Sequence, residues 1–268
     1  MPVFDAVRPI FAGVAQRFPV PSLEVNHVTV PVRDLPEALD GFTMAQVSDI
    51  HVGDGDWGPQ HLQEASDVIR HQNPDIVVNT GDFLDREPPL GRVRSITSLL
   101  TISGENRNFA VLGNHDYSAG EEIVTRLKRE LQEAGIRVLE NELVCVHAGE
   151  ICVTLAGLET EAPGWGAAVA KLGESGRPRV VLMHVPDCAE RLPAGIADLI
   201  LTGHTHGGQI AFPGREKQTV QSMCGSTFVD GMYHVNGSAV YVNRGLGCVG
   251  LPMRFRANPE VTFLTLSR

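Results

Sequence analysis

Hydrophobic residues along this chain of 268 residues follow two alternating patterns. Short apolar runs rich in β-branched residues predict strands, and longer stretches with an apolar residue every three or four positions predict helices. The predicted strands are residues 42–48, 76–80, 109–112, 151–156, 180–183 and 199–202. The predicted helices fall between the strands, at residues 59–72, 90–103, 119–134 and 164–173. This alternation is typical of a sheet flanked by helices.

The C-terminal part of the chain has a different pattern. Residues 209–212, 239–243 and 261–266 predict strands with no helix between them, which favours a second, mainly antiparallel sheet. We therefore expect an α/β protein built as a four-layer α/β/β/α sandwich. The length fits one large domain, residues 37–268, and we expect the extended N-terminal segment, residues 1–36, to pack on it.

Apolar residues near the N-terminus recur at helical spacing. The segment from residue 5 to residue 18 predicts a short amphipathic helix, which either packs on its own domain or makes a peripheral contact with a membrane surface. The first twenty residues lack the features of a secretory signal, and no segment has the roughly 18 apolar residues that span a bilayer. We expect a cytoplasmic protein, held at the membrane periphery if the second hypothesis is right.

Charge and cysteine content exclude several classes of protein. The formal net charge of −10 argues against sequence-independent nucleic-acid binding, which depends on clustered Lys and Arg. The five cysteines form no C-x-x-C motif, so the sequence predicts neither a disulfide framework nor a zinc knuckle and is compatible with a reducing compartment. We expect each cysteine to be a small buried apolar residue.

Five polar motifs follow predicted strands directly. They are Asp49-Ile50-His51, Gly81-Asp82, Gly113-Asn114-His115-Asp116, Met183-His184 and Gly203-His204-Thr205-His206. Because sites in α/β sheets form at the carboxyl ends of strands, we expect these motifs to meet at one edge. Imidazole and oxygen ligands without thiolate suit manganese, iron or zinc better than calcium.

These motifs, in this order, resemble the D-x-H, G-D, G-N-H-(D/E), H and G-H-x-H pattern of the calcineurin-like metallophosphoesterases. Other segments resemble the bacterial YkuE-like branch of that family, many of whose members are membrane-attached: residues 203–209, Pro213-Gly214, residues 242–247, Pro252 and Arg254. The resemblance covers residues 22–268 and implies the four-layer sandwich of the metallophosphoesterase type.

Carried over residue by residue, the resemblance implies two divalent metal ions, either Mn²⁺, Fe²⁺/Fe³⁺ or Zn²⁺. It places Asp49, His51 and His206 on the first ion, Asn114, His184 and His204 on the second, and Asp82 between them. A hydroxide bridging the two ions would then attack the phosphorus atom of a phosphomonoester, phosphodiester or pyrophosphate.

The resemblance also implies roles for residues around the metals. His115 would give a proton to the leaving group, and Asp85 would orient its imidazole; the alternative for Asp85 is a cap on the turn after its strand. Arg86 would bind phosphate, as in the protein Ser/Thr phosphatase branch that shares Gly-Asp-x-x-Asp-Arg, or it is a surface charge. Asn243 and Arg244, together with Arg254, would form part of the substrate wall; the alternative for the run from Asn243 to Gly247 is a glycine-rich turn between strands.

Several functions fit this ligand set. The branch resemblance implies a lipid-linked or envelope phosphoester as the substrate, and a small soluble phosphodiester such as a cyclic nucleotide is the alternative. A metal-binding scaffold without catalysis is disfavoured, because His115 and the complete ligand set are present. A metallo-β-lactamase-like hydrolase would need Asp and His where Gly208 and Gln209 stand.

Overall fold

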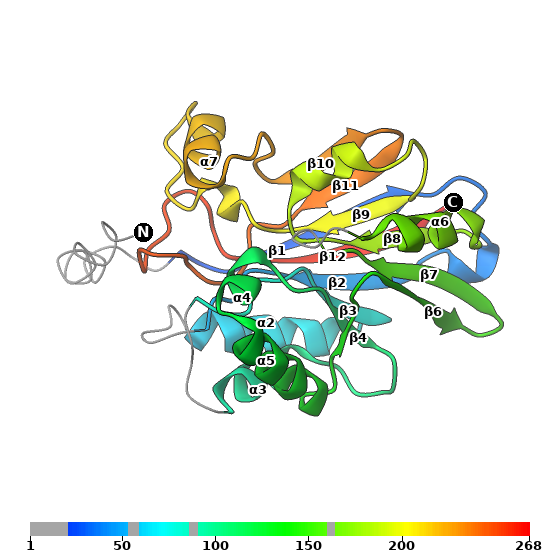
Figure 1. Cartoon of the computed structure of the whole chain (residues 1–268), viewed down its shortest axis with the longest axis horizontal. Coiled ribbons are helices and arrows are strands. Elements are labelled where there is room, and N and C mark those ends of the chain that lie inside the picture. The colour runs from blue at the N-terminus through cyan, green and yellow to red at the C-terminus, as the bar shows by residue number, and fades with distance from the viewer. Residues whose placement is uncertain (1–20, 53–58, 86–90, 160–163) are drawn as a thin grey trace.

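Two six-stranded sheets pack face to face in this computed structural model, which describes residues 21–52, 59–85, 91–159 and 164–268 (Figure 1). The strands of the first sheet, in spatial order, are β1 (Glu24–Pro31), β12 (Glu260–Ser267), β2 (Thr43–Val47), β3 (Ile76–Asn79), β4 (Asn108–Ala110) and β5 (Arg137–Val138). Those of the second sheet are β10 (Gly231–Val235), β11 (Ser238–Val242), β9 (Leu199–Thr202), β8 (Arg179–Leu182), β7 (Ile151–Gly157) and β6 (Glu142–Ala148).

Helices cover the outer faces of both sheets (Figure 1). On the first sheet they are α2 (Pro59–Gln72), α3 (Arg92–Thr97) and α5 (Glu121–Glu133), with the short α4 (Asn114–Ser118) and the 3-10 turns η1 (Glu37–Leu39) and η2 (Ser98–Leu100) nearby. On the side of the second sheet they are α6 (Gly166–Glu174), η3 (Pro186–Arg191), η4 (His206–Gly208) and α7 (Glu216–Cys224). Among the described residues, no helix is long and apolar enough to cross a membrane.

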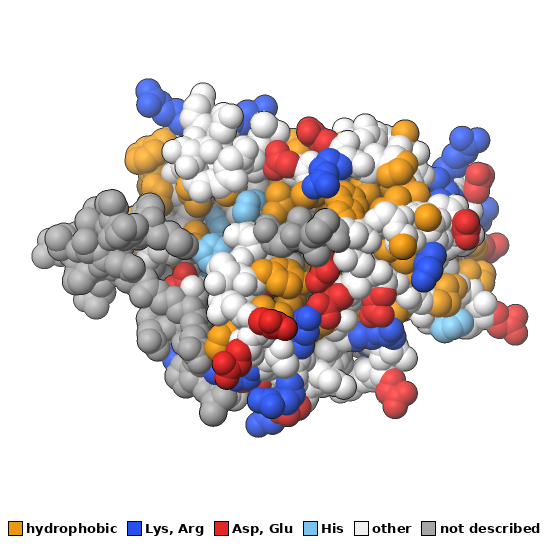
Figure 2. Space-filling view, viewed as in Figure 1, with side chains coloured by type: hydrophobic (Ala, Val, Ile, Leu, Met, Phe, Trp, Pro, Cys, Tyr) orange, Lys and Arg blue, Asp and Glu red, His pale blue; other side chains and the backbone are white. Residues whose placement is uncertain are grey.

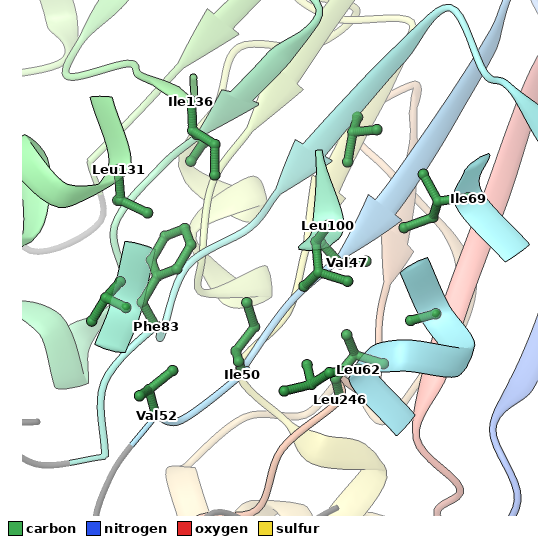
Figure 3. Close-up of a cluster of buried hydrophobic side chains, with 14 of the residues drawn as sticks. Val47, Ile50, Val52, Leu62, Ile69, Phe83, Leu100, Leu131, Ile136 and Leu246 are labelled. Carbon is green, nitrogen blue, oxygen red and sulfur yellow. The ribbon is translucent and has the colours of Figure 1, made fainter. Parts of the chain in front are cut away.

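Three separate cores account for the four layers. Alternate residues of β2 point to opposite faces, so Met44 joins the core between the two sheets, whereas Ala45 and Val47 join the core under the helices. Figure 3 shows this helix-side core, where Ile69 of α2 and Leu131 of α5 approach the first sheet. A third core lies between the second sheet and α6, and the predicted α/β/β/α sandwich is confirmed.

The six N-terminal and central strands that the sequence predicts are present as β2, β3, β4, β7, β8 and β9. The prediction of a mainly antiparallel C-terminal sheet is wrong. Strand β11 extends the second sheet parallel to β9, and β12 lies in the first sheet, parallel to β1 and antiparallel to β2. Residues 209–212 form only an isolated bridge, between Ile210 and Phe255.

The second sheet is therefore mixed. Its central strands β7, β8, β9 and β11 are parallel, and only the edge strands β6 and β10 are antiparallel to their neighbours. Strand β12 takes a central place because both of its faces are apolar: Phe263 packs on the helix side and Leu264 between the sheets.

Two cysteines depart from their predicted state. Cys145 of β6 and Cys152 of β7 form a disulfide, because the antiparallel pairing of these strands brings their Cα atoms within 5.5 Å. Cys145 is exposed and not buried as expected. The other three, Cys188, Cys224 and Cys248, lie outside the disulfide and are half-buried. A cross-strand partner in a hairpin cannot be recognised from spacing alone.

Candidate metal centre

All five polar motifs lie at one edge of the sandwich. Strands β2, β3 and β4 run parallel in the first sheet, and β8 and β9 run parallel in the second, so their carboxyl ends bring the following loops together. Hydrogen bonds join the two sheets at this edge. The backbone N–H of His204 donates to both carboxylate oxygens of Asp49 at 3.1 Å, and Nδ1 of His184 lies 2.7 Å from the carbonyl oxygen of Thr80.

The first cluster of ligand atoms consists of Asp49, His51 and His206, all buried. Nε2 of His51 lies 3.0 Å from Nε2 of His206, and Oδ1 of Asp49 lies 3.4 Å from Nε2 of His206. Nδ1 of His51 is buried and has no hydrogen-bond partner among the residues that the structure describes. Three donor atoms, two imidazole nitrogens and one carboxylate oxygen, converge on one point here. A bound cation would satisfy all three at once.

The second cluster consists of Asp82, His184 and His204. The contact with the Thr80 carbonyl places the proton of His184 on Nδ1 and directs Nε2 inward, a common arrangement for metal-ligating histidine. Nε2 of His184 lies 3.2 Å from Oδ2 of Asp82 and 3.2 Å from Nδ1 of His204.

Asp82 connects the two clusters. Its Oδ2 lies 3.2 Å from Nε2 of His184 and 3.7 Å from Nε2 of His51, while Oδ1 accepts the backbone N–H of His115 at 2.9 Å. Asn114, the first residue of α4, contributes a buried Oδ1 that has no hydrogen-bond partner in the described part of the chain. An orphaned amide oxygen costs free energy unless a ligand satisfies it, so the donor set fits divalent cations.

The backbone at this edge is strained. Five residues of the two clusters adopt left-handed φ values, which only a few per cent of non-glycine residues take: Asp49 (48°), His51 (50°), Asp82 (54°), His204 (74°) and His206 (52°). Each such conformation costs on the order of 1–3 kcal/mol and clusters at functional sites. Packing and hydrogen bonds of the surrounding structure must offset this cost, and in return the side chains of the two clusters are held close together.

Two glycines of the motifs are required by close approach. A Cβ on Gly113 would lie 2.1 Å from Oδ1 of Asp82, and a Cβ on Gly203 would lie 2.3 Å from Oδ2 of Asp49. No side chain fits at either position, because the carboxylate of Asp82 lies directly against Gly113 and that of Asp49 directly against Gly203. The glycine of the G-N-H and G-H-x-H motifs is thus part of the ligand geometry.

His115 stands beside the first cluster. Its ring meets that of His51 edge-on, with centroids 4.9 Å apart. Ligand atoms of His51, Asp85 and His115 all lie within 4.8 Å of one another, so Asp85 is close enough to influence the imidazole of His115. Asp116 caps α4: its carboxylate accepts the N–H groups of Gly113 and Leu84, both at 2.9 Å. Arg86 and residues 5–18 lie outside the described residues.

Burial and mutual charges set the protonation of the site. Burial raises the pKa of Asp49 to about 6 and lowers the pKa of His51 to about 3. Burial also disfavours charge on His184, but the carboxylates of Asp82 and Asp49 together outweigh it and raise its pKa to about 10. Burial opposes a charge on Asp82 as well, yet the His184 beside it holds the pKa of Asp82 well below its usual range.

The two predicted substrate-binding residues after β11 are engaged within the protein. Asn243 is fully buried, and its side-chain amide donates to Oε1 of Glu260 at 3.2 Å. Arg244 forms ion pairs with Glu260 at 2.6 Å and Glu24 at 3.0 Å, and 12% of its side chain is exposed. Both residues hold the loop that packs against the metal edge.

Arg254, predicted as part of the substrate wall, makes buried contacts that the sequence did not reveal. Its guanidinium is buried and donates to Nδ1 of His206 at 3.1 Å and to the carbonyl oxygens of Gly247, Ala257 and Arg244 at 2.9, 3.1 and 2.8 Å. Because a guanidinium only donates, Nδ1 of His206 accepts, and the ring proton lies on Nε2 next to His51.

Comparison with known proteins decides the family. A family model described as "Calcineurin-like phosphoesterase" matches residues 42–208, more than half of the chain. The chain belongs to the calcineurin-like phosphoesterase family. Members of this family are phosphoester hydrolases, and the family together with the two ligand clusters points to divalent metal ions as cofactors.

Relatives match this phosphoesterase over most of its length. It is 29% identical over 259 residues to the uncharacterized metallophosphoesterase YkuE of Bacillus subtilis, covering 95% of this chain and 89% of that protein. It is 30% identical over 247 residues to YkoQ of the same organism, covering 90% and 89%. A transmembrane protein with metallophosphoesterase domain from Danio rerio is 33% identical over 263 residues; the match spans 91% of this chain and 57% of that protein.

Proposed function

We propose that the protein is a binuclear phosphoester hydrolase. The observation that carries the proposal is the carboxylate of Asp82, which lies between the histidines of two clusters, 3.2 Å from His184 and 3.7 Å from His51. A single carboxylate between two convergent ligand sets is what a pair of neighbouring divalent ions requires. Bound ions of this kind would supply Lewis acidity and a hydroxide of lowered pKa.

Each ion would take its ligands from both sheets. Asp49 and His51 after β2 would hold the first ion with His206, and Asn114 after β4 would hold the second with His184 and His204, with Asp82 shared. The left-handed backbone and the two bare glycines keep these side chains in place before any substrate arrives.

The remaining residues would act on the phosphoester. His115 is half-buried at the rim of the first cluster and would give a proton to the leaving-group oxygen, with Asp85 orienting the ring. Arg86 would contact phosphate. Of the two residues after β11, Arg244 is the better candidate to face substrate, because Asn243 is fully buried.

A lipid-linked phosphoester is the substrate class that the surroundings favour. The segment after the G-H-x-H motif exposes Phe212, and the segment before β12 exposes Phe255; the two aromatic rings lie 6.1 Å apart. A small polar ester would need no apolar surface beside the metals. The name of the Danio rerio relative as a transmembrane protein is consistent with chemistry at a membrane.

Two substitutions test the proposal. In Asp82→Asn the shared ligand loses its charge, and in His115→Ala the proton donor is lost. Hydrolysis of bis-p-nitrophenyl phosphate and p-nitrophenyl phosphate with added Mn²⁺ should fall by about two orders of magnitude or more in each. His234→Ala, which changes an exposed histidine of β10, is the matched control and should keep wild-type turnover.

The two variants separate metal binding from proton transfer. We expect Asp82→Asn to lose bound metal, whereas His115→Ala should keep its metal and lose turnover most strongly for esters with poor leaving groups. Wild-type turnover in either variant, with the fold verified by circular dichroism, would contradict the mechanism.

A further inference from the structure

The most exposed large hydrophobic side chains gather at the metal edge. Among the described residues these are Phe212, Met223 and Phe255, with 57%, 42% and 41% of their surface exposed. All three belong to α7 or to the segments around η4 and before β12. Figure 2 shows hydrophobic side chains at the end of the molecule that carries α7, beside histidine side chains. Exposed aromatic side chains grouped at one end of a protein mark an interaction site.

Hydrogen bonds link the segments of the two phenylalanines to each other and to the residues that follow His206. The N–H of Phe255 donates to the carbonyl oxygen of Gln209, and the N–H of Ala211 donates to that of Phe255, both at 2.8 Å. Nε2 of Gln209 donates to the carbonyl oxygens of Val249 and Leu251 at 3.1 and 2.9 Å. Gln209 is three residues from the ligand His206. A partner that binds the phenylalanines is therefore held close to the metal ligands.

Basic side chains flank this apolar surface. Arg256 follows Phe255 directly. The backbone N–H of Arg215 donates to the carbonyl oxygen of Phe212 at 2.9 Å, and this turn places Arg215 next to Phe212. Both arginines are exposed, and neither forms an ion pair with any described residue. The adjacent Glu216 has its carboxylate turned to the N–H of Gly214 at 3.1 Å. Two cations beside two aromatics stand out on a chain with a net charge of −10.

We propose that Phe212 and Phe255, with Arg215 and Arg256, form a docking surface for an anionic lipid bilayer. The aromatic rings would enter the interfacial region of the bilayer, and the guanidinium groups would contact anionic headgroups. Charge complementarity selects this occupant, since a neutral apolar partner needs no flanking arginines. The inference extends the proposed function by delivering the metal centre to a substrate in the membrane, but the binding itself does not require activity.

Co-sedimentation with vesicles tests the surface in the full chain. Wild type should bind vesicles of phosphatidylcholine mixed with phosphatidylglycerol. Its affinity for pure phosphatidylcholine vesicles should be lower by a factor of about ten or more. Phe212→Ser/Phe255→Ser should lower the partition coefficient on anionic vesicles about tenfold or more. Arg215→Gln/Arg256→Gln should lower it about fivefold or more and remove most of its dependence on salt.

A matched control removes the same charge elsewhere. Arg33 and Arg268 are exposed at the opposite edge, with 88% and 60% of their side chains exposed, so Arg33→Gln/Arg268→Gln should bind like wild type. The thermal unfolding temperature of every variant should stay unchanged, which shows that the fold is intact. The proposed docking surface is contradicted if wild type does not sediment with anionic vesicles, or if the phenylalanine variant binds them as wild type does. Sedimentation is measured without substrate, so it is decided separately from the hydrolase proposal.

Discussion

At the scale of single residues, Arg254 shows how a side chain outside the motifs shapes the metal edge. Its guanidinium joins the segment that carries His206 to the loops at Gly247 and Ala257. A buried arginine without these acceptors would be very costly, and the acceptors without the arginine would be left unsatisfied. The residue is therefore a structural requirement of the site.

Arg254→Met should reduce the free energy of unfolding by about 3–5 kcal/mol, because it leaves buried carbonyl oxygens without their donor. Urea denaturation of the metal-free protein measures this directly. The neighbouring Arg256→Met is the control: its side chain is exposed, so we expect a change of less than about 0.5 kcal/mol. Equal stability of the two variants would show that the hydrogen bonds of Arg254 contribute little.

Protonation of the ligands makes metal binding depend on pH. In the metal-free site His184 carries a proton on both ring nitrogens up to its pKa of about 10. Asp49 is protonated up to its pKa of about 6. His51 and His204 are already neutral at pH 7, because burial lowers their pKa values to about 3 and about 4. A metal ion must displace the proton of His184 throughout the neutral range and that of Asp49 below pH ~6.

The dissociation constant for Mn²⁺ should therefore fall about tenfold per pH unit between pH ~6.5 and ~8.5, and more steeply below pH ~6. Isothermal titration calorimetry in buffers of different ionisation enthalpy would detect about one proton released on binding at pH ~7.5. His184→Ala should bind more weakly and with a flatter dependence. A pH-independent affinity of the wild type would contradict the raised pKa of His184.

Most residues of the two clusters could be predicted to lie together because each belongs to a short polar motif directly after an apolar strand. Arg254 could not, since nothing in the run Leu251-Pro252-Met253-Arg254-Phe255 shows which distant atoms its side chain meets. The anchor of His184 is likewise hidden, because it is the backbone carbonyl of Thr80 and has no signature in the side chains.

At the scale of elements, strand existence was predictable and strand pairing was not. Apolar runs identify β2, β3, β4, β7, β8 and β9 because each is buried on both faces. The same reasoning identified β11 and β12 but gave them the wrong pairing: β11 is parallel to β9, and β12 lies in the first sheet. Pairing depends on which exposed edge a strand meets, and that is a long-range property.

Strand β1 and hairpin strands β6 and β10 are weaker cases. Their residues are mostly half-buried or exposed, as expected at the edge of a sheet, and His27, His147 and His234 interrupt their apolar patterns. A strand of this kind gives little hydrophobic signal in the sequence. The pairing of β6 with β7 was therefore missed, and with it the disulfide between Cys145 and Cys152.

At the scale of the whole molecule, the two sheets share one functional edge. Asp49, His51, Asp82 and Asn114 come from the first sheet, and His184, His204 and His206 come from the second. Neither sheet alone carries a complete ligand cluster: the first cluster combines Asp49 and His51 with His206, and the second combines Asp82 with His184 and His204. Metal binding therefore requires the packed sandwich and stabilises it in return.

The count of bound ions tests this account most directly. Native mass spectrometry on protein loaded with Mn²⁺, supported by elemental analysis, should give about two ions per chain. His206→Ala removes a proposed ligand of the first ion and Asn114→Ala a proposed ligand of the second, so each should retain about one ion, while His234→Ala keeps two. One ion or none in the wild type under saturating Mn²⁺ would contradict a binuclear phosphoester hydrolase.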